Sequence, residues 1–398
     1  MRKDLLEKWL MTKQKESELK EVNISQTVLD LPEGVPLLNT FYLYMTTGCN
    51  LFCQHCWITP KFIKGEPSPG EFIQLEHLKN AVKEGKTLGL SSAKFTGGEP
   101  LLHPQFREIL DYLTSEDLKL TMETNATLID QELAEYIKEN SNLTFVSTSL
   151  DSHRPEFHDK FRGMEGAFKK TVQGIEYLVK AGYRPQVIMS PHKANIHDVD
   201  ELVKFAVSIG AGSVKLNPVT PNGRGKKMIK DGLTLDYDEL VNLVRYVRGE
   251  LQEKTSIALH VSLPPALQTI KELLNNKSGQ CNVQGILGIL GSGEMALCGI
   301  GRNIPELCFG TLGKDSLRDV WINNPTLVRL RKDLEGEYPG LCGDCIHSHR
   351  CQTECVAINY SLTGELVHPY YICEDALELG MFPATRRRSY ISPENEKK

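Results

Sequence analysis

The cysteines of this 398-residue chain are the residues best suited to chemistry, and they fall into two groups. Cys49, Cys53 and Cys56 form a C-x3-C-x2-C triplet near the front of the chain. The other eight lie in the last third of the chain and are Cys281, Cys298, Cys308, Cys342, Cys345, Cys351, Cys355 and Cys373. Because a cubane 4Fe-4S cluster needs four ligands, three plus eight cysteines predict one cluster with an open iron and two fully ligated clusters. We expect the chemistry to occur at the open iron.

The spacing alone leaves other metal sites open. A short cysteine group such as the triplet also binds zinc or forms an ordinary ferredoxin-like site. The block from Cys342 to Cys355, C-x2-C-x5-C-x3-C, fits a structural zinc site with four thiolates, although that interpretation leaves Cys281 and Cys298 unexplained. In a reducing cytosol, tight spacings of this kind favour metal ligands over disulfides.

The cysteine triplet follows the first of six expected strands, in a region where strands alternate with helices. Short β-branched or apolar runs predict strands at 41–45, 93–96, 119–124, 144–150, 186–190 and 213–217. Apolar residues at helical spacing predict helices around 75–82, 106–113, 133–137, 172–179 and 202–206. This alternation predicts an α/β fold with a parallel sheet, built as a partial (β/α)6 TIM-like barrel rather than a full barrel of eight strands. Such a barrel places its active site at the carboxyl ends of the strands, where the triplet lies.

The rest of the sequence predicts smaller units around the barrel. We expect an N-terminal helical extension over 1–36, the barrel over 37–228, a bridge over 229–280, a small cysteine-rich domain over 281–383 and a disordered tail over 384–398. The bridge should contain a helix over 238–251, a strand over 257–263, a break at Pro264 and Pro265, and a second helix. A further helix is expected over 317–334. The cysteine-rich domain should owe much of its order to bound metal.

Composition excludes several classes of protein. The formal net charge of -5, with both signs mixed, disfavours a nucleic-acid-binding protein, and Arg386, Arg387 and Arg388 are expected to be solvated in the polar tail. The chain lacks the run of about 18 apolar residues that a membrane span needs. Its N-terminus lacks the continuous apolar segment of a secretory signal, so we expect a cytoplasmic protein without membrane partners.

A glycine motif follows the second expected strand. Gly97, Gly98, Glu99 and Pro100 form GGEP, which without the cysteines would be an ordinary glycine turn. Together with the triplet after the first strand, GGEP resembles the radical S-adenosylmethionine (SAM) superfamily. The resemblance implies that the triplet holds a 4Fe-4S cluster, that SAM binds its open iron, and that GGEP contacts the SAM amino group, with Glu99 a candidate acceptor. It also implies reductive cleavage of SAM to a 5'-deoxyadenosyl radical that abstracts a substrate hydrogen, while the protein supplies position and excludes water.

Several polar residues at later strand ends also resemble positions of this family. Asn125, Ser149, Asp151 and Arg162 resemble residues around the SAM ribose and carboxylate, and the segment 218–225 resembles an adenine-side segment. Alternatively, Ser149 and Asp151 form a strand end with a helix cap, Arg162 makes a surface ion pair, and the segment is a simple turn.

The later cysteines, with Gly293 between Cys281 and Cys298, resemble the SPASM domain, the auxiliary-cluster extension of peptide and protein maturases. The resemblance implies an outer cluster held by Cys342, Cys345, Cys351 and Cys373, and an inner cluster held by Cys281, Cys298 and Cys355. Cys308 departs from the common pattern: it is a fourth inner ligand, a hydrogen donor or a structural thiol, and the cysteine count favours ligation. No thiol would then be free to quench a substrate radical, which favours an oxidative reaction that returns an electron through the auxiliary clusters. The expected cofactors are therefore three 4Fe-4S clusters and SAM.

Within this family we expect a maturase that abstracts a hydrogen from a ribosomally made precursor peptide and forms a thioether or carbon-carbon bond. The expected partners are the precursor peptide, an electron donor such as flavodoxin or ferredoxin, and either a separate leader-recognition protein or the N-terminal helix. The alternatives are a sulfatase-type formylglycine maturase, a tetrapyrrole side-chain-modifying enzyme, and a non-catalytic iron-sulfur electron carrier. A tetracarboxylate substrate would need a basic pocket, for which Lys215, Arg224, Lys226 and Lys227 are candidates unless they form a solvated loop.

Overall fold

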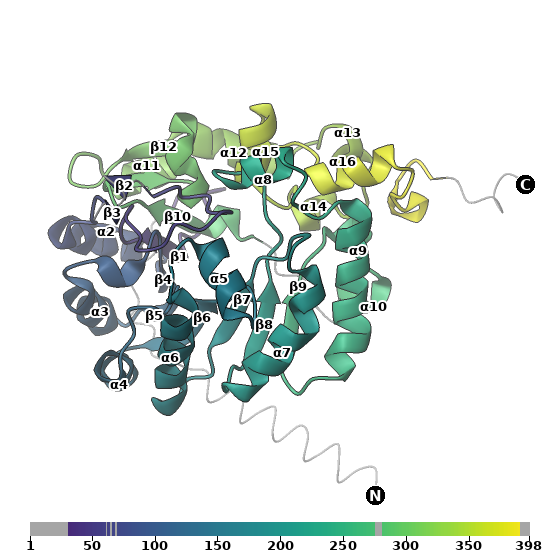
Figure 1. The fold of residues 1–398 in the computed structure, drawn as a ribbon. Coiled ribbons are helices and arrows are strands. Elements are labelled where there is room, and N and C mark those ends of the chain that lie inside the picture. Colours follow the sequence, from purple (N-terminus) through teal and green to yellow (C-terminus); the bar gives the residue numbers. More distant parts are fainter. Residues whose placement is uncertain (1–30, 61, 64–65, 68–69, 275–280, 391–398) are drawn as a thin grey trace, which may run out of the picture.

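A ten-stranded sheet is the main element of the structure, which is a computed structural model (Figure 1). It describes residues 31–390 except 61, 64–65, 68–69 and 275–280. The expected N-terminal helix and the end of the expected tail therefore lie outside the described residues. The strand order is β12-β11-β10-β1-β4-β5-β6-β7-β8-β9.

All six expected strands are present and run parallel to their neighbours. They are β1 (Thr40–Tyr44), β4 (Ser92–Thr96), β5 (Lys119–Thr124), β6 (Leu143–Ser149), β7 (Gln186–Met189) and β8 (Ser213–Leu216). Since parallel strands end at one edge of a sheet, the loops after them meet there. The TIM-like α/β fold is thereby confirmed.

The sheet does not end at six strands, because segments beyond the expected barrel pair with both of its edges. On one side β9 (Ala258–Val261) runs parallel to β8, and on the other β10 (Ile286–Ile289) runs parallel to β1. The strands β11 (Glu294–Ala296) and β12 (Cys308–Thr311) follow in antiparallel pairing. An edge strand has unpaired backbone groups, and these additions satisfy them. The hairpin of β2 (Phe62–Ile63) and β3 (Glu66–Pro67) is separate.

Helices connect the strands as the apolar spacing predicted. The expected ones are α2 (Leu75–Thr87), α3 (Phe106–Ser115), α4 (Gln131–Asn140), α6 (Ala167–Lys180) and α7 (Val199–Ser208). The shorter connecting helices are η1 (Pro100–Leu102), α5 (Pro155–Arg162), η2 (Ile196–Asp198) and α8 (Gly225–Lys230). In α3 the residues Phe106, Ile109, Leu110 and Leu113 are all buried, so one face packs on the sheet and the other is polar.

The bridge has the expected order of elements. It contains α9 (Tyr237–Tyr246), a π-helical continuation η3 (Val247–Leu251), β9, η4 (Pro265–Leu267) and α10 (Ile270–Leu274). In the last third the single helix expected over 317–334 is wrong, because it divides into α11 (Leu317–Asn323) and α12 (Pro325–Glu335). Pro325 has no N–H to continue a helix, and the Asn324 side chain caps α12 by accepting from the N–H groups of Thr326 and Leu327.

The remaining elements of the last third are short. They are η5 (Val283–Gly285), η6 (Gly299–Asn303), η7 (Pro305–Leu307), α13 (Gly340–Asp344), α14 (Ser348–Cys351), α15 (Val356–Thr363), α16 (Tyr371–Glu378) and η8 (Ala384–Arg386). Figure 1 shows these green and yellow elements across one end of the sheet. Trp321 of α11 is buried and donates to the Pro36 carbonyl at 2.9 Å, while Glu84 of α2 accepts from the Ser316 hydroxyl at 2.7 Å. The last third therefore packs directly on the barrel.

The expected disordered tail is wrong for residues 384–390, which are anchored to the short helix α13 that carries Cys342 and is followed by Cys345. Asp344 accepts from Arg387 Nε at 2.6 Å and from the Ser389 N–H at 2.7 Å. Arg388 donates to the Gly343 carbonyl at 3.0 Å. These arginines find carbonyl and carboxylate acceptors on neighbouring elements, so they are not simply solvated as expected.

Replacement of Asp344 by alanine should release this tail. The variant loses the charge-assisted acceptor of Arg387 and Ser389, so trypsin should cleave after Arg386, Arg387 or Arg388 about tenfold faster than in the unmodified protein. Limited digestion followed by mass spectrometry measures this rate. An Asp333→Ala variant, which removes an exposed partner of Arg329, is the control and should leave tail cleavage unchanged.

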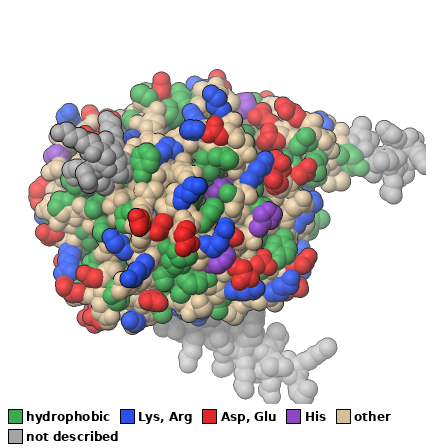
Figure 2. Space-filling view, in the orientation of Figure 1, with side chains coloured by type: hydrophobic (Ala, Val, Ile, Leu, Met, Phe, Trp, Pro, Cys, Tyr) green, Lys and Arg blue, Asp and Glu red, His purple; other side chains and the backbone are tan. Residues whose placement is uncertain are grey.

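Acidic and basic side chains are interspersed on the face shown in Figure 2, as the mixed composition suggests. Among the described residues, no helix combines the length and the apolar character needed to cross a membrane.

Candidate active site

The cysteine triplet lies in the loop after β1, where Cys49 and Cys53 are buried and Cys56 is half-buried. The Cys49 sulfur receives the Leu51 N–H at 3.4 Å, and the Cys53 sulfur receives Arg162 Nη1 at 3.6 Å. Burial raises the pKa of both thiols, and the positive charge of Arg162 opposes this rise at Cys53. N–H donors and a guanidinium beside sulfur stabilise the thiolate form that binds metal.

The GGEP loop packs directly against the cysteine loop because two of its residues have no side chain. A Cβ added to Gly98 would lie 1.6 Å from the Gly48 carbonyl oxygen. At Gly97 the backbone has φ +123°, and a Cβ would lie 2.9 Å from the Thr46 carbonyl oxygen. Both glycines line a hollow of about 170 Å³ beside the three cysteines, which we call the cysteine-loop hollow.

Glu99 fixes the GGEP loop through buried hydrogen bonds. Its side chain is fully buried, and both carboxylate oxygens accept from protein groups. Oε1 accepts from the Thr124 hydroxyl at 2.7 Å, and Oε2 accepts from the Asn125 N–H at 2.8 Å. Burial raises the pKa of Glu99 to about 7. The carboxylate therefore joins GGEP to the end of β5. This geometry does not favour the expected contact of Glu99 with SAM, which stays a prediction. Pro100 is also buried and begins η1.

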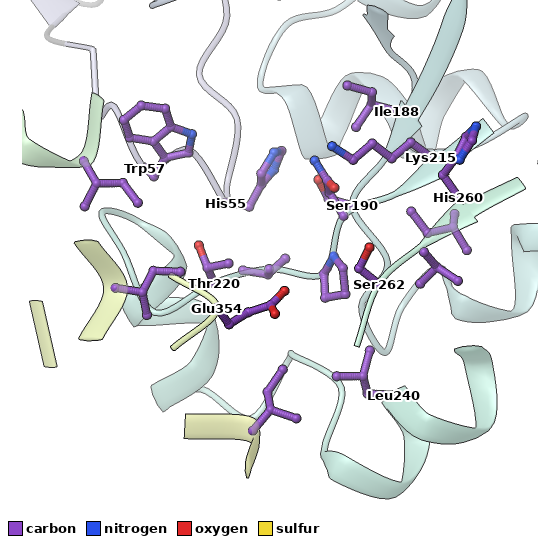
Figure 3. Close-up of a pocket in the computed structure, with 18 of the residues that line it drawn as sticks. His55, Trp57, Ile188, Ser190, Lys215, Thr220, Leu240, His260, Ser262 and Glu354 are labelled. Carbon is purple, nitrogen blue, oxygen red and sulfur yellow. The ribbon is translucent and has the colours of Figure 1, made fainter. Parts of the chain in front are cut away.

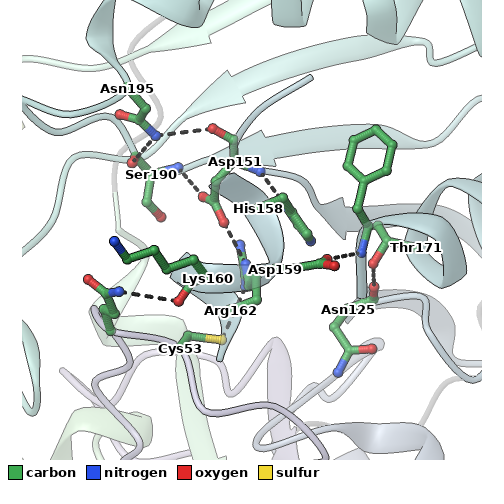
Figure 4. Close-up of polar contacts among 12 residues, drawn as sticks. Cys53, Asn125, Asp151, His158, Asp159, Lys160, Arg162, Thr171, Ser190 and Asn195 are labelled. Carbon is green, nitrogen blue, oxygen red and sulfur yellow. Dashed lines mark hydrogen bonds and ion pairs between the residues drawn. The ribbon is translucent and has the colours of Figure 1, made fainter. Parts of the chain in front are cut away.

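Asp151 and Arg162 form a buried ion pair beside Cys53 (Figure 4). Asp151 Oδ2 lies 2.5 Å from Arg162 Nε, and Asp151 Oδ1 accepts from the Ser190 N–H at 2.9 Å. Burial alone would raise the pKa of Asp151, but the positive charge of Arg162 holds it below its usual value. The surface ion pair considered for Arg162 is therefore wrong, as is the helix cap considered for Asp151, because the residue that caps α5 is Arg154.

Most of the residues expected around SAM converge on the cysteine-loop hollow. Asn125, Ser149 and Arg162 line it together with Gly97 and Gly98, whereas Glu99 and Pro100 are not part of its lining. The Asn125 amide donates to Asn50 Oδ1 at 2.8 Å, which ties the end of β5 to the cysteine loop.

A second cavity of about 440 Å³ opens inside the sheet next to this hollow, and we call it the barrel cavity (Figure 3). The two spaces share His55, Trp57, Glu123, Ser149 and Arg162 in their walls, so a molecule in one touches the lining of the other. The far wall comes from the last third of the chain and includes Glu354, Ile358, Tyr370 and Tyr371. A substrate-sized space thus adjoins the triplet.

Several residues that line the two spaces lie outside the motifs that predicted the site. Glu123 is one of them, and its charge at a position near the end of a strand was the available signal. Lys215, which lines the barrel cavity, was already a candidate of the basic pocket. Trp57 and Glu354 lie in irregular segments whose position no periodicity reveals. The segment 218–225 packs on the cysteine loop, since Arg224 N–H donates to the Cys56 carbonyl at 3.0 Å.

The donor set fits a 4Fe-4S cluster with SAM: three thiols on one loop, N–H donors at their sulfurs, and a polar hollow beside them. The family model described as "Radical SAM superfamily" matches residues 43–206, and the model of SPASM, an "iron-sulfur cluster-binding domain", matches residues 281–346. The chain belongs to the radical SAM superfamily. It is an enzyme of that superfamily with a SPASM domain, which confirms both resemblances. The two domains bind a 4Fe-4S cluster with SAM and iron-sulfur clusters, respectively, so iron-sulfur rather than zinc binding is confirmed for the SPASM domain.

Several known proteins are similar to this radical SAM enzyme. The AdoMet-dependent heme synthase of Methanosarcina barkeri is 28% identical over 344 residues, which cover 82% of this chain and 94% of that protein. The antilisterial bacteriocin subtilosin biosynthesis protein AlbA of Bacillus subtilis is 32% identical over 55% of this chain and 47% of its own length. The structure of Streptococcus suis SuiB bound to SAM is similar in fold, with a TM-score of 0.67 and 16% identity over 88% of this chain and 80% of that chain.

The SPASM cysteines form two groups in the structure. Cys345 and Cys373 share one apolar cluster, and Cys342 and Cys351 lie close enough that their thiols, with that of Cys345, raise the pKa of Cys373 beyond the effect of burial. Burial likewise raises the pKa of Cys298 to about 12, with further contributions from the thiols of Cys355 and Cys281. This grouping matches the expected outer set and three of the expected inner set.

Cys308 lies apart from both groups. Its thiol donates to the Gly301 carbonyl at 3.4 Å. Burial raises its pKa to about 11, and the further contribution comes from Glu294 rather than from another described thiol. The geometry therefore favours a structural thiol over the expected fourth inner ligand.

A Gly98→Ala substitution should disturb the cysteine-loop hollow. The new Cβ would overlap the Gly48 carbonyl, so GGEP and the cysteine loop must separate, and a displacement of about 1 Å in a positioned site costs up to about 100-fold in rate. Formation of 5'-deoxyadenosine after reduction measures the loss. Gly249→Ala, where a Cβ meets nothing within 4 Å, is the matched control and should keep the full rate.

Proposed function

We propose that this radical SAM/SPASM enzyme matures a ribosomally made peptide, by abstracting a hydrogen from one residue and forming a thioether or carbon-carbon bond. The barrel cavity carries this proposal. Its volume of about 440 Å³ lies at the small end of ligand pockets, about 300 to 1,000 Å³, and suits one or two amino-acid side chains beside the cysteine-loop hollow.

The residues of this chain would position the peptide and keep water away from it. Bound SAM and clusters would supply the hydrogen-abstracting radical and an electron acceptor. The aromatic rings of Trp57, Tyr370 and Tyr371 wall the cavity and exclude water from the reacting residue. Arg162 and Ser149 face both spaces and would hold the two reactants in register.

The relatives supply two candidate substrates. Among them, AlbA takes part in the biosynthesis of a bacteriocin, and a second structure of SuiB is bound to a precursor peptide. A second candidate, modification of tetrapyrrole side chains, is favoured by the heme synthase, because that match spans 94% of the relative and most of this chain.

The finer assignments belong to the same proposal. Cys49, Cys53 and Cys56 would hold the SAM cluster, and two auxiliary clusters would use the outer set Cys342, Cys345, Cys351 and Cys373 and the inner set Cys281, Cys298 and Cys355. We also propose unit boundaries at 37–228, 229–280 and 281–383. The same proposal includes a cytoplasmic location, an electron donor such as flavodoxin or ferredoxin, and a leader-recognition protein.

Co-expression under anaerobic conditions with each short peptide encoded beside the gene tests the function, with intact mass as the measurement. The proposal expects one peptide to lose two hydrogens with the unmodified enzyme and none with the Cys53→Ala variant. Unchanged peptides, together with SAM cleavage stimulated by an iron porphyrin that bears acid side chains, would instead establish the second candidate.

A further inference from the structure

Two charged side chains in the wall of the barrel cavity, Glu123 and Arg162, each form an ion pair with a residue outside the cavity lining. Lys94 Nζ lies 2.6 Å from Glu123 Oε1, and Glu123 Oε2 accepts from the Thr96 hydroxyl at 3.3 Å. Arg162 is matched by the buried carboxylate of Asp151. The wall residues Glu123 and Arg162 therefore each have a partner of opposite charge, and neither partner is part of the cavity lining.

Lys215 is the exception among the basic residues of this wall. It lies on β8, half-buried, with its ammonium extending into the cavity (Figure 3). Among the described residues, no ion pair or hydrogen bond joins Lys215 to a partner; the carboxylate of Glu123, which Lys94 and Thr96 engage directly, interacts with Lys215 only through its charge. Burial lowers its pKa, the negative charge of Glu123 opposes this effect and Lys94 adds to it, so an anion that approached the ammonium directly would further stabilise the cation.

The other basic residues of the candidate pocket lie elsewhere. Lys227 pairs with Asp231 on the surface of α8, and Lys226 is exposed on the same helix. The Arg224 guanidinium stacks on the Phe52 ring at 4.0 Å. Lys215 is thus the one member of that sequence-based group in the cavity wall.

We propose that Lys215 binds a carboxylate of the substrate, so that the substrate carries an acid group within a few ångströms of the abstracted hydrogen. This rests on the proposed function only in taking the barrel cavity as the substrate site. The hydroxyl-bearing residues Ser190 and Ser262 line the same side of the cavity and can donate to the second carboxylate oxygen (Figure 3). One ammonium with hydroxyl donors matches a single carboxylate, whereas a phosphate dianion generally recruits arginines or clustered backbone N–H groups.

The opposite wall gives the substrate an orientation. Glu354 faces the cavity from the SPASM side, across from Lys215 (Figure 3). An acid group directed at Glu354 would meet another carboxyl group and no positive charge, while one directed at Lys215 meets an opposite charge. The carboxylate comes from a glutamate or aspartate of a peptide, or from an acid side chain of a tetrapyrrole, and the two sources are separated by experiment.

Binding to the anaerobic holoenzyme with SAM tests the proposal without relying on turnover. The first pair of probes is a terminally blocked short peptide with one glutamate and the same peptide with glutamine. The second pair is coproporphyrin III and its tetra-amide. We expect the acid form of at least one pair to bind about tenfold to 100-fold more tightly than its neutral form, as a charge-assisted hydrogen bond provides.

Variants assign that preference to Lys215. Lys215→Met should bind both forms of the pair equally, Lys215→Arg should retain part of the preference, and the surface control Lys204→Met should retain all of it. An undiminished preference in Lys215→Met, or equal binding of acid and neutral forms of both pairs by the unmodified enzyme, overturns the proposal. If Lys215→Met does not fold, the proposal is still tested by Lys215→Arg and by the comparison of acid and neutral probes with the unmodified enzyme. A preference seen only with the porphyrin pair supports the carboxylate site and contradicts the proposal that the enzyme matures a peptide.

Discussion

Replacement of Cys53 by alanine should reduce the formation of 5'-deoxyadenosine from SAM to the level of an enzyme-free control. Two thiols cannot hold the cluster as three do, so the chain should also lose roughly four irons. Both quantities are measured on anaerobically reconstituted protein, by chromatography after reduction and by iron analysis.

Cys308→Ala is the matched control for this experiment, because Cys308 is a half-buried thiol that lies apart from all the proposed cluster ligands. It should keep both the iron content and the cleavage of SAM. Loss of about four irons in Cys308→Ala would restore Cys308 as an inner ligand, and normal SAM cleavage by Cys53→Ala would refute the assignment of the triplet.

Arg162→Met should destabilise the fold by about 3 to 5 kcal/mol, because it leaves the Asp151 carboxylate, which is 0% exposed, without its positive partner. Urea unfolding followed by tryptophan fluorescence measures the change. Arg154→Met removes a pair in which Arg154 is exposed and Asp198 is half-buried, and it should cost about 1 kcal/mol or less.

The pH dependence of the Arg162 variant has a definite sign. With Arg162 present, the pKa of Asp151 lies below its usual value, so the pair stabilises the fold at neutral pH and this contribution is lost as the pH falls below about 4. Without Arg162, burial raises the pKa of Asp151, so the folded variant takes up a proton more readily than the unfolded chain. The stability deficit of the variant should therefore be smaller at pH 5 than at pH 8, and a deficit that grows on acidification would contradict this account.

The expected elements of the barrel came from local signals that tertiary structure did not override. The strand over 119–124 was predicted at its observed bounds, because alternating buried residues and the following Asn125 mark it clearly. The prediction of one helix over 317–334 is wrong because the apolar periodicity continues across Pro325, although this proline ends the first helix. The extra strands β9 to β12 join the sheet through backbone pairing, which has no side-chain signature of its own.

The sequence by itself determined the chemistry of this protein, since cysteine spacing and GGEP are local patterns and the ligands of one cluster lie on one loop. Tertiary structure decided what these residues face. Glu99 is a brace rather than part of the hollow, Cys308 stands apart, and the last third of the chain closes the cavity with Glu354 and Tyr370. Lys215 has no direct ion-pair partner among the described residues, and the carboxylate of Glu123 pairs with Lys94 of the neighbouring strand β4. Charge matching depends on distances between strands far apart in sequence, and no pattern along the chain encodes those distances.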